Sequence, residues 1–151
     1  QLQDMLSLLH TQPDTVRAHL LECAAHQFEE GDVQHWWHPP RLGVRTRISD
    51  DRLFLPYVTA LYVQVTGDAS VLGQEVPYLH GEPLADGERE RLFTPEVSEV
   101  SEPLRLHCLR AIDLTPTGAH GLPLMGGGDW NDAMDRVGGE NGKGVWLGMF
   151  L

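Results

Sequence analysis

The chain has 151 residues, of which 22 are acidic and 11 are basic, so its formal net charge is −11. This excess of negative charge argues against nucleic acid or an anionic membrane as a general partner, because both bind basic surfaces. Apolar residues make up 41% of the sequence, as in ordinary globular domains. No apolar run reaches the roughly 18–20 residues that span a bilayer, and no signal peptide is visible. We therefore expect a cytoplasmic protein, either by itself or as part of a parent tethered to the inner membrane.

Both ends of the sequence indicate that residues 1–151 are part of one larger domain. Gln1 already lies inside a helical pattern, and the apolar run 145–151 has no cap or polar tail. Such a run would expose apolar surface, which normally packs against another segment or protein. We expect a partial domain, truncated at both ends, whose main partner is the remainder of the parent polypeptide; a homodimer remains open.

The first predicted helix spans residues 13–28. Pro13 suits a first turn, apolar residues recur every three or four positions, and Gly31 ends the pattern. The following segment, 32–48, is rich in Trp, His and Pro. Because Pro39-Pro40 prohibits regular helix, we interpret this segment as a connection.

A second helix is predicted from Ser49 to Gly67. Ser49 can cap it, and Asp50 lies in the first turn, where a carboxylate is favourable. Pro56 should kink the axis. The β-branched run 63–66 could be a strand, but its three- and four-residue spacing favours helix.

The rest of the chain predicts shorter elements. Residues 68–76 indicate a short helix closed by Pro77, and 80–100 indicate a long polar connection. Ser101 can cap a further helix, and another begins near Val145. Helices joined by long loops predict an all-α array, such as an α/α toroid, with functional residues in the loops.

Segment 35–51 contains residue types typical of a carbohydrate site. They are two adjacent tryptophans, clustered arginines and paired aspartates: Trp36, Trp37, Arg45, Arg47, Asp50 and Asp51. Charged groups make strong hydrogen bonds to hydroxyls, and indoles pack on the apolar faces of sugars. The alternative is structural, with the arginines and aspartates in surface ion pairs and the tryptophans in the core. This segment alone leaves both interpretations open.

The stretch 126–132, Gly-Gly-Gly-Asp-Trp-Asn-Asp, is the most informative motif. Three glycines let the backbone turn tightly and approach a ligand closely. The acids that follow can protonate a glycosidic oxygen, while the indole covers a sugar ring. A glycine-rich turn with an aspartate also occurs in ordinary loops. The motif is neither a Walker loop nor a GxSxG nucleophile elbow.

Metal binding is not expected. His35 and His38 are three residues apart, but zinc would need further ligands that the adjacent Pro39-Pro40 cannot present on a helix. Cys23 and Cys108 lack metal-ligand spacing, and we expect buried thiols rather than a disulfide.

Together, segments 34–38, 43–51 and 128–134 resemble glycoside hydrolase family 94, which comprises inverting phosphorylases such as cellobiose and chitobiose phosphorylases. Residues 93–99 and 121–128 look closest to the phosphorylase-like C-terminal region of cyclic β-1,2-glucan synthases. The resemblance covers most of the chain. It implies that residues 1–151 are part of an (α/α)6-barrel catalytic domain.

The resemblance also implies roles for particular residues. Asp132 matches the general acid of the family, and Arg45 and Asp51 match the pair that holds the transferred glucosyl unit. The substrate-binding candidates are Arg45, Asp51, Trp130, Asp129 and Trp37. An inverting hydrolase needs a second carboxylate to activate water, whereas phosphate is already an anion. The implied substrates are a β-glucan oligosaccharide and inorganic phosphate, the implied product is α-glucose 1-phosphate, and no cofactor or metal is implied.

The sequence departs from the family at Ala133, where the family has glycine, and the family's phosphate-binding residues would lie beyond Leu151. We therefore expect the isolated chain to be inactive. Three alternatives stay open: a cellobiose- or chitobiose-type phosphorylase, a hydrolase with Asp129 as the second carboxylate, and a degenerate glucan-binding module that controls chain length.

Overall fold

The structure is a computed structural model that describes residues 1–128, 130, 134, 136 and 141–149. Its α-helices are α1 (Leu2–Met5), α2 (Pro13–Ala24), α3 (Asp50–Thr66) and α4 (Leu104–Asp113). Its strands are β1 (Gln34–His38), β2 (Leu42–Thr46), β3 (Glu75–His80), β4 (Glu90–Phe93) and β5 (Glu96–Pro103). Short 3-10 turns are η1 (Leu6–Leu8), η2 (Ala69–Gly73), η3 (Ala119–Gly121) and η6 (Leu147–Met149). Among these described elements, no helix is both long and apolar enough to cross a membrane.

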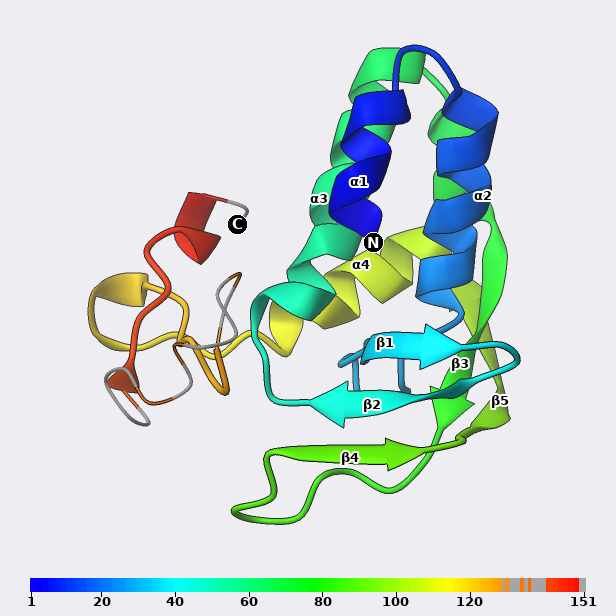
Figure 1. Cartoon of the computed structure of the whole chain (residues 1–151). Coiled ribbons are helices and arrows are strands. Elements are labelled where there is room, and N and C mark those ends of the chain that lie inside the picture. Colours follow the sequence, from blue (N-terminus) through cyan, green and yellow to red (C-terminus); the bar gives the residue numbers. More distant parts are fainter. Residues whose placement is uncertain (129, 131–133, 135, 137–140, 150–151) are drawn as a thin grey trace.

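The prediction of an all-α barrel fragment is wrong, because the chain is a mixed α/β fragment with two antiparallel sheets. One sheet has the order β1-β2-β4 and the other pairs β3 with β5. Both segments interpreted as connections, 32–48 and 80–100, contain strands. Figure 1 shows the β1-β2-β4 sheet below the helices, with β3 and β5 passing beside them.

The prediction of the two long helices is largely confirmed. Helix α3 follows Ser49 and ends at Gly67, whose left-handed φ of 74° terminates it. Pro56 is accommodated inside α3, and the strand alternative for 63–66 is wrong. Helix α2 begins at Pro13 as predicted but ends at Ala24, four residues early.

The early end of α2 has a tertiary cause. The backbone of Gln27 and Phe28 leaves the helix to form bridges with Val33 and Leu79. The Leu79 amide donates to the Gln27 carbonyl at 2.7 Å. Pairing with the sheet therefore replaces the last turn that the apolar periodicity predicts.

The shorter predicted elements are only partly correct. The helix expected over 68–76 is reduced to η2, and Pro77 lies within β3 rather than closing a helix. Helix α4 begins after Pro103, while Ser101, its expected cap, belongs to β5. In place of a helix near Val145, the structure has η6.

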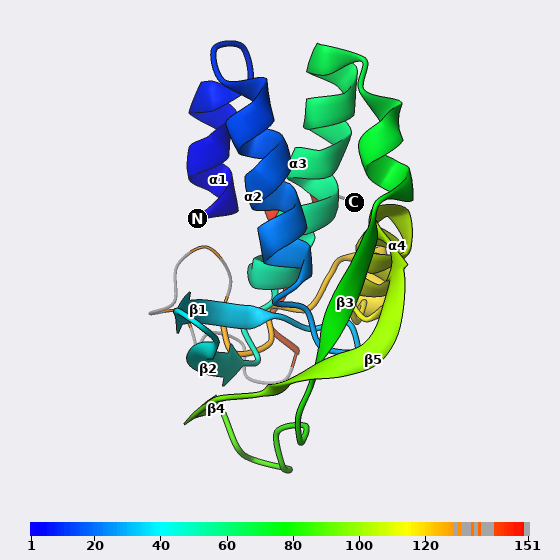
Figure 2. The ribbon, with the colours of Figure 1, turned by 90° about the vertical axis from the view of Figure 1, so that its right-hand side faces the viewer.

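The main core lies between the helices that stand side by side in Figure 2. Val16 and Leu20 of α2 are fully buried there against Leu55 and Val58 of α3. Helix α4 joins this core through Leu104. The core fixes the N-terminal end of α3, where the candidate site begins.

Candidate functional site

A pocket of about 300 Å³ opens where the N-terminal segment, β1 and the first turn of α3 meet Trp130. Its polar lining includes Gln34, His35, Asp50 and Asp51, and its aromatic lining is Trp37, Phe54 and Trp130. A sugar has hydroxyl donors around a ring with apolar faces. A pocket with a few hydrogen-bond acceptors for the hydroxyls and aromatic side chains for the ring faces therefore suits a sugar.

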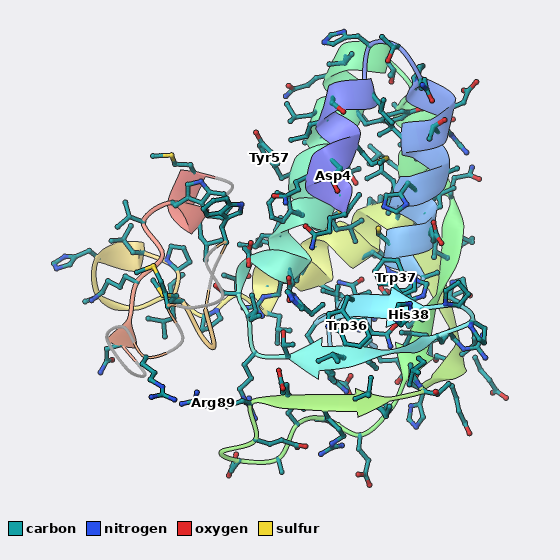
Figure 3. The ribbon with its side chains drawn as sticks, viewed as in Figure 1. Asp4, Trp36, Trp37, His38, Tyr57 and Arg89 are labelled. Carbon is teal, nitrogen blue, oxygen red and sulfur yellow. The ribbon has the colours of Figure 1, made fainter. Side chains whose placement is uncertain are left out.

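Strand β1 directs its two tryptophans to different surroundings. Trp37 stacks on His26 with ring centroids 4.0 Å apart and lines the pocket. Trp36 is exposed and meets His38 edge-on at 5.5 Å. Figure 3 shows both tryptophans and His38 projecting from β1. The Trp37 ring is therefore supported from behind by a second ring, which holds it as a flat wall of the pocket.

His26 supports Trp37 as a neutral imidazole. Its Nδ1 lies 2.8 Å from the Glu22 carbonyl, which can only accept, so Nδ1 carries the proton. Burial lowers the pKa of His26. A neutral ring can stack on the indole without bringing a charge into the apolar contact.

The Asp51 carboxylate is held by two neighbouring side chains. His35 Nδ1 lies 2.9 Å from Oδ1 and 3.0 Å from Oδ2 of Asp51. Thr46 Oγ1 donates to Oδ2 at 3.1 Å. The Ile48 amide donates to the same threonine hydroxyl at 3.2 Å, which orients its proton toward the carboxylate. Strand β1 and the end of strand β2 thus determine where this carboxylate points.

Arg45 is buried in a different cluster, with its side chain 2% exposed. Its Nε and Nη2 both donate to Asp32, each at 2.6 Å, and Nη2 also donates to Glu30 at 3.0 Å. Nη1 donates to the Gly81 carbonyl at 3.1 Å, and the guanidinium lies 3.9 Å from the Phe28 ring centre. Arg45 is not among the described residues that line the pocket.

The glycine-rich segment pairs with the residues that precede α3. The Gly127 amide donates to the Arg47 carbonyl at 2.7 Å. The amide and hydroxyl of Ser49 donate to the Gly128 carbonyl at 2.9 and 3.0 Å. Gly126 has a φ of +61°, and a Cβ on it would lie 2.3 Å from the Arg47 carbonyl oxygen. Only glycine fits this close approach, which delivers Trp130 to the pocket.

The comparison of sequences decides the family. The model of the glycosyl hydrolase 94 superfamily catalytic domain matches residues 1–151. The chain belongs to this superfamily. The family resemblance seen in the motifs is therefore confirmed.

Several curated proteins are similar to this family 94 chain over its whole length. It is 49% identical to the cyclic beta-(1,2)-glucan synthase NdvB of Rhizobium meliloti (strain 1021) and covers 6% of that protein. It is 26% identical to a solabiose phosphorylase and 27% identical to a 3-O-beta-D-glucopyranosyl-beta-D-glucuronide phosphorylase, both of Paenibacillus borealis. It covers 17% and 18% of these two proteins. The chain thus spans less than a fifth of the length of each of these relatives.

The structure brings together three of the predicted substrate-binding residues of this family 94 chain. Asp51, Trp37 and Trp130 line one pocket, although they come from α3, β1 and the glycine-rich segment. Arg45 does not join them, so the structure does not place it beside Asp51 as a pair, and its role stays a prediction. The predicted acid Asp132, the candidate Asp129 and the variant position Ala133 lie outside the described residues.

Sequence reasoning missed other residues of the pocket. His35 was considered only as a metal ligand with His38, yet it faces Asp51 while His38 packs on Trp36. In strand β1, His35 precedes Trp37 by two positions, a spacing that shares a face, but this signal was hidden while 32–48 was interpreted as a connection. Gln34 and Phe54 also line the pocket and were not singled out.

The cysteines and histidines form no metal centre within the part of the chain that the structure describes. There, no three His, Cys, Asp or Glu side chains gather closely enough to hold an ion. Cys23 and Cys108 are free thiols, as predicted. Burial raises their pKa values, to about 12 for Cys23 and about 11 for Cys108, so both stay protonated at neutral pH.

Removal of Asp32 should destabilise the protein much more than removal of Glu30, although both carboxylates bind Arg45. Asp32→Ala leaves a buried guanidinium without its bidentate partner, and we expect a loss of about 3–5 kcal/mol. The Glu30 side chain is 44% exposed, so Glu30→Ala should cost less than about 1 kcal/mol. Urea unfolding of the protein that contains this chain measures both. Equal losses would contradict the assignment of Asp32 as the main partner.

Gly126→Ala should disturb the site more than Gly121→Ala. Both glycines have a left-handed φ, so alanine costs about 1–2 kcal/mol at either position. A Cβ at Gly121 meets nothing within 4 Å, whereas one at Gly126 collides with the Arg47 carbonyl. The additional loss at Gly126 should appear in the unfolding free energy and as a changed Trp fluorescence spectrum of the native state. A Gly126→Ala protein that matches Gly121→Ala in both measurements would contradict the observed docking.

Proposed function

We propose that the chain forms part of the active site of an inverting glycoside phosphorylase that acts on β-glucans, with β-1,2-linked chains as substrates. The supporting observation is the convergence of Asp51, Trp37 and Trp130 on one pocket, which the docking of the glycine-rich segment brings about. The name of the 49% identical relative, a cyclic beta-(1,2)-glucan synthase, supports the linkage. The names of two further relatives, both phosphorylases, support phosphate as the attacking group.

The pocket has the chemistry to bind one glucosyl unit. The Asp51 carboxylate is an acceptor for hydroxyl donors, and hydrogen bonds to charged groups are stronger than neutral ones. Trp37 and Trp130 offer flat apolar faces for the ring hydrogens of the sugar. Trp130 is 63% exposed, so most of its ring is available to a ligand.

The proposed reaction needs one protein acid. Asp132 follows Trp130 by two residues and would donate its proton to the glycosidic oxygen as the bond from that oxygen to C1 breaks. A phosphate oxygen would attack C1 from the opposite face and form the new bond there. The configuration at C1 is inverted, so a β-glucoside yields α-glucose 1-phosphate and a glucan with one unit fewer. This scheme uses inorganic phosphate as co-substrate and neither a cofactor nor a metal.

The decisive experiment uses the complete protein that contains this chain. Incubation with β-1,2-glucooligosaccharides, with and without inorganic phosphate, should release α-glucose 1-phosphate only when phosphate is present. Free glucose released without phosphate would instead indicate a hydrolase. Binding without any product would favour the glucan-binding module, provided that cellobiose and chitobiose also give no product.

Asp132→Asn should lower the rate of the complete enzyme by about 10²–10⁴, the typical contribution of a general acid. Asp129→Asn makes the same change at the other aspartate of the motif and serves as the matched control. We expect a smaller loss for it. Steady-state release of α-glucose 1-phosphate measures both. Near-full activity of Asp132→Asn would refute its role, and a larger loss in Asp129→Asn would identify Asp129 as the acid.

A further inference from the structure

We propose that His35 is a positioning residue that fixes the Asp51 carboxylate so that its Oδ1 accepts a hydrogen bond from one particular hydroxyl of the substrate. This inference rests on the proposed function in one respect, since it takes a sugar to be the ligand of the pocket. It does not depend on whether the sugar is cleaved by phosphate, cleaved by water or only bound.

The proton on His35 is defined by its partner. A carboxylate only accepts hydrogen bonds, so a ring nitrogen 2.9 and 3.0 Å from its two oxygens must carry a proton. Because Nδ1 contacts both oxygens of Asp51, the imidazole lies across the carboxylate rather than at one of its ends. This contact restricts the rotation of the carboxylate about its terminal bond.

Thr46 makes the arrangement asymmetric. Its hydroxyl donates to Oδ2 of Asp51, while the Ile48 amide donates to that same hydroxyl. Oδ2 therefore receives two hydrogen bonds, from Thr46 and from His35. Among the described residues, Oδ1 receives one hydrogen bond, from His35. A carboxylate oxygen can accept about two, so the remaining capacity of Asp51 lies on Oδ1.

The location of Asp51 makes this capacity relevant to a ligand. Asp51 lines the pocket, and its side chain is 17% exposed, so a ligand can reach it while little bulk water competes. A fixed, partly desolvated anion binds a correctly placed hydroxyl and discriminates against a substrate that lacks it. His35 thus contributes to specificity through its hold on Asp51.

The main test compares two substitutions of His35. In His35→Asn, the side-chain NH2 group lies close to the position of Nδ1 and can still donate to Asp51. In His35→Leu, the donor is removed. We expect His35→Asn to keep kcat/KM for β-1,2-glucooligosaccharides within about threefold, and His35→Leu to lose about 10–100-fold, the range for a hydrogen bond to a charged group. His38→Leu, an exposed position on the same strand, is the control and should match the wild type.

A series of monodeoxy substrates separates positioning from a general structural effect. In the wild type, one deoxy substrate should be markedly poorer than the others, and His35→Leu should largely abolish that difference. Equal losses by His35→Leu on every substrate, or a wild type that tolerates every deoxy substrate, would overturn the proposal. If His35→Leu does not fold, Thr46→Val removes the other donor to Asp51, and we expect the same pattern with a smaller amplitude.

The same variants distinguish this inference from failure of the proposed reaction. If the complete protein releases no α-glucose 1-phosphate, calorimetric affinities for the intact and deoxy oligosaccharides replace kcat/KM. If removing one hydroxyl from the ligand weakens its binding to the wild type more than its binding to His35→Leu, that result would support positioning by His35 although phosphorolysis had failed. An affinity that is equal in the wild type and His35→Leu for all ligands would reject it.

Discussion

The backbone pairing of residues 126–128 with residues 47–49 is the constraint on which the candidate site depends. It joins segments about 80 residues apart, and closing a free loop of that length would cost about 4 kcal/mol or more. Three hydrogen bonds, each with a net contribution of about 1 kcal/mol, would not offset that cost by themselves. The rest of the fold must therefore shorten the loop beforehand.

That shortening comes from the packing of α4 against α3. Just beyond α4, the Thr115 hydroxyl accepts a hydrogen bond from Arg52 Nε in the first turn of α3, at 3.2 Å. Once this contact exists, only residues 116–125 separate it from the glycines. Closing such a short loop costs much less, so the glycine pairing can be stable. The core thus determines the site indirectly, because helix packing lowers the entropy cost of closing the loop that ends in the glycine-rich motif.

The helices were predictable from the sequence because their apolar spacing reports the face that packs on the core. Val16 and Leu20, for example, both predict α2 and are fully buried in it. The strands were not predictable, because neither sheet has a clean alternation of apolar and polar residues. Strand β5 carries glutamates and exposed valines, and Pro77 lies in β3. A two-stranded sheet tolerates such residues, because among the described residues β5 pairs only with β3, and the outer edge of β3 carries only the isolated bridge at Leu79.

Because the strands could not be predicted, only some features of the candidate site could be predicted from the sequence. Trp37, Asp51 and Trp130, which line the pocket, were singled out by residue type and by the family resemblance, and their roles stay predictions. The different hydrogen-bond partners of Arg45 and Asp51 were not predictable, because they follow from strand β2. Neighbouring residues of a strand point to opposite sides, so Thr46 reaches Asp51 while Arg45 enters the cluster around Asp32. A spacing of six residues could not reveal this while 32–48 was interpreted as a connection.

The balance of charge also limits where phosphate could bind in the proposed reaction. The guanidinium of Arg45 is neutralised by Asp32, and the pocket itself presents Asp50 and Asp51. This lining suits hydroxyl donors and opposes a phosphate dianion, which needs cationic or amide donors. An inverting displacement requires the attacking group on the face of the sugar opposite the leaving oxygen. The phosphate ligands should therefore come from a separate, cationic wall contributed by other parts of the protein, with the acidic pocket reserved for the glucosyl unit.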